Sequence, residues 1–142
     1  MKTSSKSNQN VNDPSSAPRY ECIMLVDDNS MDNFINNRLI ESCGFASEII
    51  ICQSAEEGLQ YLSAGKNLPQ LVFLDINMPG MNGFDFLTSM ADLPEIVQHH
   101  CRIIMLSTSE SFKDLNRANK NKFVRKFLNK PLTLEVLAAI KV

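Results

Sequence analysis

Short runs of hydrophobic residues recur along the chain, and polar residues follow each of them. The runs are rich in Ile, Val, Leu and Phe, which is typical of strands that are buried on both faces of a parallel sheet. The predicted strands cover residues 22–26, 48–52, 71–74, 103–106 and 123–128. Arg125 and Lys126 interrupt the last of these runs.

Segments with the helical spacing of apolar residues lie between the predicted strands. The helix predicted over residues 30–43 has its apolar positions at Met31, Phe34, Ile35, Leu39 and Ile40. Gly44 follows it, as is typical of a helix end. Further helices are predicted over residues 54–62, 84–90, 111–121 and 132–141. Ser54 and Glu57 have the spacing of a capping box, and Pro131 is placed to begin the last helix at its first turn.

Five alternating strands and helices predict an α/β fold with a parallel sheet covered on both faces. At this chain length the common arrangement is the flavodoxin-like (βα)5 three-layer sandwich, with strand order 2-1-3-4-5. Residues 1–18 are polar and rich in Ser and Asn, so we expect them to form a flexible N-terminal tail. The folded domain is predicted over residues 19–142.

Three acidic side chains follow two of the predicted strands. Asp27 and Asp28 come directly after the first strand, and Asp75 comes directly after the third. In the expected strand order these strand ends are neighbours, so the carboxylates should lie close together and would repel one another without a cation. Mg²⁺ suits such oxygen ligands, and beside it Asp75 could act as a nucleophile towards phosphorus.

The ends of the fourth and fifth predicted strands add a hydroxyl and an ammonium group. Lys130 follows the fifth apolar run and could neutralise charge on phosphoryl oxygens. Ser107 follows the fourth run and could donate a hydrogen bond to a phosphoryl oxygen on Asp75, a role for which we favour it over Thr108. The alternative is that Ser107 caps the next helix, although Ser109 or Ser111 could do so equally well.

Composition and charge exclude several other classes of protein. A formal net charge of −2 gives no electrostatic reason to expect direct binding of nucleic acid. There is no apolar stretch of membrane-spanning length, and the N-terminus lacks a signal-peptide pattern.

The four cysteines lack metal-finger spacing and favour a reducing, cytoplasmic compartment. Residues 93–101 end in His99, His100 and Cys101, which we interpret as an ordinary exposed loop rather than a soft-metal site.

The chain resembles the receiver domains of response regulators in two-component signalling, over about residues 20–142. Four motifs in compatible order carry this resemblance, at residues 26–29, 74–83, 105–108 and 129–131. It implies that Asp75 is the phosphoacceptor, that Asp27 and Asp28 help to hold Mg²⁺, and that the backbone carbonyl of Asn77 completes the protein ligands. It also implies the roles of Ser107 as switch hydroxyl, of Phe127 as switch aromatic residue and of Lys130 as the lysine before a cis proline.

The resemblance predicts a stand-alone, phosphorylation-dependent signalling switch rather than an enzyme with a diffusible product. A sensor histidine kinase, a histidine phosphotransfer protein or a small acyl phosphate would supply the phosphoryl group. Met31, Phe34 and Ile35 are candidates for the donor-docking surface, although we expect some of them to face the core. The phosphorylated domain would change its affinity for an unknown protein target, and a phosphorylation-dependent dimer is a further expectation.

Two alternative classes fit the residues less well. A haloacid-dehalogenase-like Mg²⁺ phosphatase also uses an aspartate nucleophile, but Asn77 stands where that family has its second acid, the general acid/base. A flavin- or nucleotide-binding module would offer backbone amides to a phosphate in its first loop. Here Asp27 and Asp28 occupy that loop and would repel a phosphate.

Overall fold

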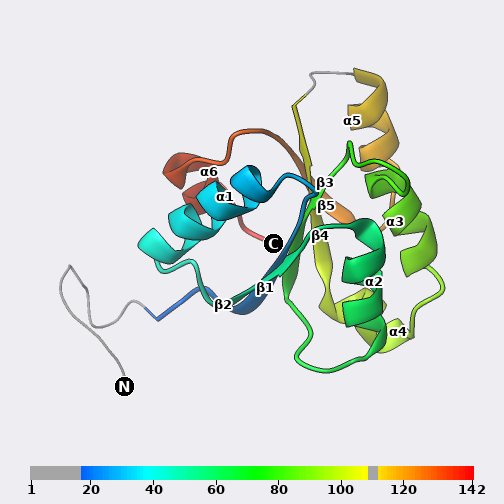
Figure 1. The fold of residues 1–142 in the computed structure, drawn as a ribbon, viewed down its shortest axis with the longest axis horizontal. Helices are drawn as coiled ribbons and strands as arrows, with labels where there is room; N and C mark the ends of the chain where they lie inside the picture. The colour runs from blue at the N-terminus through cyan, green and yellow to red at the C-terminus, as the bar shows by residue number, and fades with distance from the viewer. Residues whose placement is uncertain (1–16, 109–111) are drawn as a thin grey trace.

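The computed structural model describes residues 17–108 and 112–142. They form a five-stranded parallel sheet with the strand order β2-β1-β3-β4-β5, which confirms the predicted topology (Figure 1). The strands are β1 (Tyr20–Val26), β2 (Ala46–Cys52), β3 (Leu71–Asp75), β4 (Arg102–Ser107) and β5 (Val124–Asn129). The helices are α1 (Ser30–Ser42), α2 (Ala55–Ser63), α3 (Gly83–Met90), α4 (Glu95–His100), α5 (Phe112–Asn119) and α6 (Leu134–Ala139).

Helices cover both faces of the sheet, so the fold has three layers. In Figure 1, α1 and α6 lie on one side of the sheet and α2, α3, α4 and α5 on the other. Each interface has its own hydrophobic core; Phe73 is buried in the first, and Phe86 in the second. This arrangement is the flavodoxin-like (βα)5 fold that the alternating pattern predicts.

The burial of the strands explains which apolar runs are continuous. All five residues of β3 are buried, and β4 is buried from its second residue onward. β5 lies at an edge of the sheet and is only partly buried, so Arg125 and Lys126 in its sequence reach solvent. Central strands of a parallel sheet therefore give the clearest sequence signal.

Three local predictions were wrong. Residues 93–101 are not simply a loop, because they contain α4, whose Val97 is buried. The last helix begins at Leu134 with Thr133 as its N-cap, so Pro131 precedes the helix instead of occupying its first turn. The capping box at Ser54 is only half formed, because the Glu57 carboxylate accepts a hydrogen bond from the Gln53 N–H.

The apolar stripe of α1 also differs from its prediction. The buried residues of this helix are Asn33, Asn36 and Ile40. Met31, Phe34 and Ile35 are instead all exposed. The expectation that some of these three residues face the core was therefore wrong. The Asn33 side chain donates a hydrogen bond to the Asp27 carbonyl oxygen at 2.8 Å, which gives this buried polar residue a partner.

Two further expectations lie partly outside the described residues. The predicted tail at residues 1–18 overlaps the description only at Ala17 and Pro18, and both are exposed. The expected helix over residues 111–121 is described from Phe112, and Ser109 and Ser111 lie outside the described residues. Within the described part of the chain, no helix combines the length and the apolar character that a membrane span needs.

Candidate functional site

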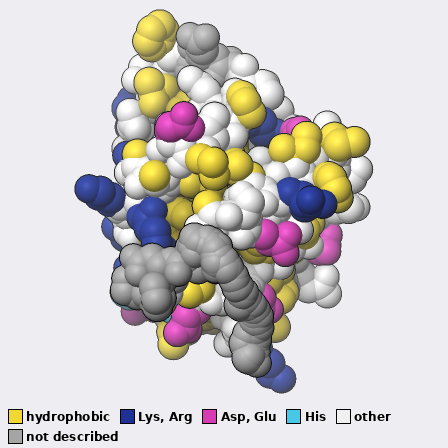
Figure 2. Space-filling model, turned by 90° about the vertical axis from the view of Figure 1, so that its left-hand side faces the viewer, with side chains coloured by type: hydrophobic (Ala, Val, Ile, Leu, Met, Phe, Trp, Pro, Cys, Tyr) yellow, Lys and Arg dark blue, Asp and Glu magenta, His cyan; other side chains and the backbone are white. Residues whose placement is uncertain are grey.

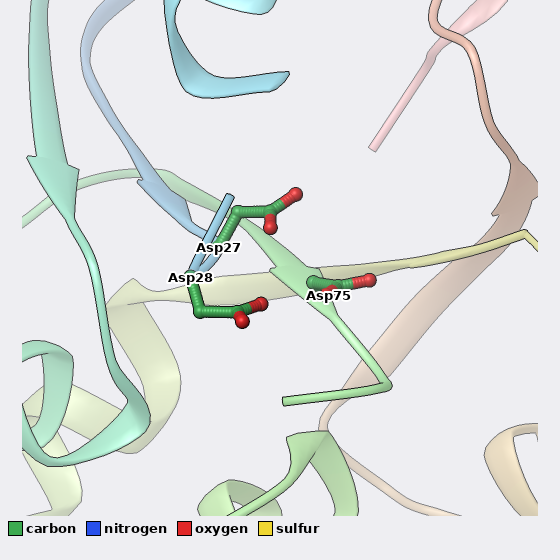
Figure 3. Close-up of side chains that lie close together, drawn as sticks. All are labelled: Asp27, Asp28 and Asp75. Carbon is green, nitrogen blue, oxygen red and sulfur yellow. The ribbon is translucent and has the colours of Figure 1, made fainter. Parts of the chain in front are cut away.

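The three predicted acidic residues converge at the carboxyl edge of the sheet. Asp75 ends β3, and Asp27 and Asp28 follow β1, its hydrogen-bonded neighbour. One carboxylate oxygen from each of the three residues lies within 4.8 Å of those from the other two. Figure 3 shows the three side chains pointing to the same side of these two strand ends. Asp27 and Asp75 are buried, whereas Asp28 is exposed to solvent.

Lys130 reaches into this cluster from the end of β5. Its ammonium lies 2.8 Å from Asp27 Oδ2 and 3.2 Å from Asp75 Oδ1. The Lys130–Pro131 peptide bond is cis, in agreement with the prediction. The Lys130 N–H donates to the Ser107 carbonyl oxygen at 2.8 Å, which ties the lysine to the end of β4.

Asp32 also contacts Lys130, and the strand-end pattern did not reveal it. Its Oδ2 lies 3.0 Å from the ammonium, so Lys130 binds three carboxylates. Asp32 is in the first turn of α1, where Asn29 caps the helix. An acidic residue in the helical turn after Asp27 and Asp28 was the available signal, but such residues are common at helix starts for other reasons.

Burial and charge shift the proton affinities of these groups. Burial, together with the neighbouring Asp27, raises the pKa of the Asp75 carboxyl to about 6, although Lys130 opposes the shift. Burial lowers the pKa of the Lys130 ammonium, but hydrogen bonds to Asp27 and Asp32 outweigh it and hold that pKa above the usual range. The lysine is therefore a permanent cation beside a carboxylate that is costly to ionise.

The chemistry of this donor set fits Mg²⁺. Three carboxylates within 4.8 Å offer hard oxygen ligands, and one of them reaches solvent, so bound water can complete the coordination. One ammonium only partly balances the charges of Asp27, Asp28 and Asp75. Among the described residues, groups of three or more His, Cys, Asp or Glu side chains that could hold a metal converge only here. His99, His100 and Cys101 are therefore not part of such a group.

The other predicted site residues take the following positions. Ser107 is the last residue of β4; it is buried, and its Cα pairs with Asn129 in β5. Asn77 is exposed and lies two residues beyond Asp75. Phe127 is half-buried in β5, where it packs against the core beneath α2 to α5. The sheet thus brings Ser107 to the same edge as Asp75, whereas Phe127 lies further back along its strand.

The fold and this cluster define a class of signalling domain. Residues 23–141 match the family described as the response regulator receiver domain. The match covers most of the chain, so the protein belongs to the response-regulator receiver domain family.

Individual relatives agree with this assignment. The chain is 32% identical over 119 residues to the probable methanogenesis regulatory protein FilR2 of Methanothrix harundinacea, across 81% of this chain and 75% of FilR2. It is 30% identical over 122 residues to the 3′,5′-cyclic-nucleotide phosphodiesterase regA of Dictyostelium discoideum, across 85% of this chain but 15% of regA. The region shared with regA is therefore a small part of that longer protein.

Solved structures show the same fold. A response regulator receiver protein from Dyadobacter fermentans has a TM-score of 0.76 and 28% identity, across 82% of this chain and 91% of that chain. A two-component response regulator from Cytophaga hutchinsonii also has a TM-score of 0.76, with 27% identity across 84% of this chain and 92% of that chain. The similarity extends over nearly the whole receiver unit in both cases.

Proposed function

We propose that this protein is a phosphorylation-dependent signalling switch whose phosphoacceptor is Asp75. One observation carries the proposal: the Asp75 carboxylate ends β3 within 4.8 Å of two other carboxylates and 3.2 Å from the Lys130 ammonium. A buried nucleophilic oxygen, a cation-binding cluster and a fixed positive charge are the parts that phosphoryl transfer to a carboxylate requires.

In the proposed reaction, an Asp75 carboxylate oxygen forms a bond to the phosphorus of the donor. The bond from phosphorus to the donor's histidine nitrogen breaks, and the nitrogen keeps the electron pair. With a small acyl phosphate, the bond to the acyl oxygen breaks instead. The Lys130 ammonium binds the transferred phosphoryl oxygens. Asp27, Asp28, Asp75 and the carbonyl of Asn77 would hold Mg²⁺, which neutralises phosphoryl charge when bound.

The switch would consist of two residues near the acceptor. The Ser107 hydroxyl would donate a hydrogen bond to a phosphoryl oxygen on Asp75, and Phe127 would turn inward as the hydroxyl moves. Ser107 is buried at the neighbouring strand end, and the half-buried Phe127 has core side chains on one side. One covalent anion would thereby bias the domain between two conformations.

The proposed phosphoryl donor is a sensor histidine kinase or a histidine phosphotransfer protein, which would dock on α1. Met31, Phe34 and Ile35 expose 62%, 57% and 52% of their surface, next to the acidic cluster in sequence. Figure 2 shows the face of the molecule that bears α1 and α6, where hydrophobic side chains gather among charged ones. An exposed apolar group of this kind is typical of a protein-binding surface.

The proposed output is a change in affinity for another protein, with a phosphorylation-dependent dimer as one form of it. The domain would catalyse its own phosphorylation and the hydrolysis of its aspartyl phosphate, and we propose no turnover of a further substrate. We propose the cytoplasm as its location, because its four cysteines are all free and three of them are buried as thiols.

The acceptor assignment is testable by intact mass spectrometry after incubation with acetyl phosphate and Mg²⁺. We expect the wild-type chain to gain one phosphoryl group, and we expect Asp75→Asn and EDTA-treated protein to gain none. Asp85→Asn is the matched control, because Asp85 is also an aspartate but lies in the first turn of α3, where its carboxylate accepts a hydrogen bond from the N-cap residue, Asn82. Equal labelling of Asp75→Asn and wild type would refute the assignment.

A further inference from the structure

Lys130 binds a carboxylate that the proposed chemistry does not use. Asp27 and Asp75, at 2.8 and 3.2 Å from the ammonium, belong to the cluster at the strand ends. Asp32, at 3.0 Å, comes instead from the first turn of α1. It is not one of the three carboxylates that converge as a metal site. Because Asp32 contacts Lys130, any effect of Asp32 on the acidic cluster should act through the lysine.

The start of α1 directs the Asp32 carboxylate to Lys130. Asp85 holds the equivalent position in α3, and there the carboxylate accepts a hydrogen bond from the N–H of the capping residue, Asn82, at 3.0 Å. In α1 the N–H of the capping residue, Asn29, donates to Asp27 Oδ1 at 2.9 Å instead. Asp27 thus takes the usual partner of Asp32, and Asp32 pairs with the lysine.

Lys130 and a divalent cation compete for the same two carboxylates. An ammonium that is fully committed to Asp27 and Asp75 would weaken cation binding there. When a cation takes those carboxylates, the Lys130 side chain, only 13% exposed, still needs an anionic partner, because a buried unpaired charge is costly. Asp32 is such a partner; its side chain is 37% exposed and lies on the helix side of the cluster.

We propose that Asp32 is a positioning residue that holds the Lys130 ammonium towards α1 and thereby raises the affinity of the acidic cluster for Mg²⁺. The inference rests on the proposed function, which places Mg²⁺ at Asp27, Asp28 and Asp75. Asp32 acts on the cation through Lys130, and it is not itself a ligand.

The test is to measure the Mg²⁺ affinity of the full chain by isothermal titration calorimetry, without any phosphoryl donor. We expect Asp32→Asn to weaken Mg²⁺ binding by about three- to tenfold, because the freed ammonium pairs more fully with Asp27 and Asp75. Asp32→Glu keeps the carboxylate and should recover most of the affinity. Glu57→Gln is the matched control, because it removes the same charge from the equivalent position of α2 and should change the affinity less than about twofold.

A double-mutant cycle separates positioning from simple attraction between charges. In a Lys130→Met background, Asp32→Asn should change the Mg²⁺ affinity less than about twofold, since no ammonium remains to be held. Lys130→Gln replaces Lys130→Met if thermal melts show that the methionine variant is unfolded at the titration temperature. An effect of Asp32→Asn that persists in full without Lys130 would overturn the proposal.

Two other outcomes are also decisive. Unchanged Mg²⁺ affinity in Asp32→Asn, with wild type binding normally, would overturn the role of Asp32 and leave the proposed function intact. Absence of Mg²⁺ binding in wild type would overturn both the metal part of the proposed function and this inference.

Discussion

Gly83 packs directly against the backbone of Asp75. A Cβ atom at position 83 would lie 2.8 Å from the Asp75 carbonyl oxygen and 3.0 Å from the Ile76 Cα. The Gly83 N–H also donates to the Ile76 carbonyl oxygen at 2.9 Å. The start of α3 therefore closes the loop after β3 onto the proposed acceptor, and any side chain at position 83 would push the two apart.

We expect Gly83→Ala to lower the free energy of unfolding by about 1–3 kcal/mol and to slow phosphorylation of Asp75 by acetyl phosphate, because the added carbon displaces the acceptor backbone. Urea titration and the initial rate of labelling measure the two effects. Gly44→Ala is the control: its φ of 63° strains an alanine by about 1–2 kcal/mol, but no atom lies within 4 Å of the added carbon. Equal labelling rates in both variants would contradict this prediction.

The carboxyl edge of the sheet was predictable because buried parallel strands leave a clear trace in the sequence. β3 is buried throughout, so its apolar run predicts a strand, and the Asp75 that ends it is predicted as a candidate site residue. The cluster then follows from topology alone, since strands β1, β3, β4 and β5 are adjacent.

Features that depend on side-chain direction were not predictable in this way. The stripe of α1 indicated core positions, yet Phe34 is exposed and Asn36 is buried. α4 has six residues with only Val97 buried, which is too short for a periodic pattern. The Lys130–Asp32 pair joins residues 98 positions apart. It forms at a helix start where the N–H of the capping residue, Asn29, donates to Asp27 instead of to Asp32. Nothing in local spacing indicates such a contact.

Asp75→Asn should stabilise the metal-free protein at neutral pH. Burial and Asp27 raise the pKa of Asp75 to about 6, so the folded state retains this proton to a higher pH than the unfolded state does. The cost of ionising Asp75 is therefore absent below its ordinary pKa near 4 and complete above about pH 6, where it reaches about 2–3 kcal/mol. In urea titrations in EDTA, the free energy of unfolding of the variant should exceed that of wild type by more at pH 8 than at pH 4. An equal difference at both pH values would contradict the prediction.

Native protein should react with iodoacetamide at one cysteine. Cys43 is exposed, whereas Cys22, Cys52 and Cys101 are buried. Burial raises the pKa of Cys22 and Cys52 to about 11 and that of Cys101 to about 12, so all three stay protonated at pH 8. Mass spectrometry at pH 8 should find one adduct in native wild type, none in Cys43→Ser and four in urea-unfolded wild type. More than one native adduct would contradict the buried positions.

Arg19 should define where the stable domain begins. Its guanidinium donates to the carbonyl oxygens of Leu137 and Ile140 at the end of α6, and it lies over the Phe45 ring at 5.2 Å from the centroid. We expect Arg19→Met to lower the free energy of unfolding by about 1–3 kcal/mol, because charge-assisted hydrogen bonds to two helix-end carbonyls are lost.

Deletion of residues 2–18 is the control for Arg19→Met. This deletion leaves the Arg19 contacts in place, so it should change the free energy of unfolding by less than about 0.5 kcal/mol. Urea titration of both proteins checks the expectation. A deletion that costs as much as Arg19→Met would show that the segment before Arg19 contributes to the fold and is not a tail. We expect the two variants to differ because Arg19 itself donates the hydrogen bonds to the Leu137 and Ile140 carbonyl oxygens at the end of α6, and the deletion retains Arg19.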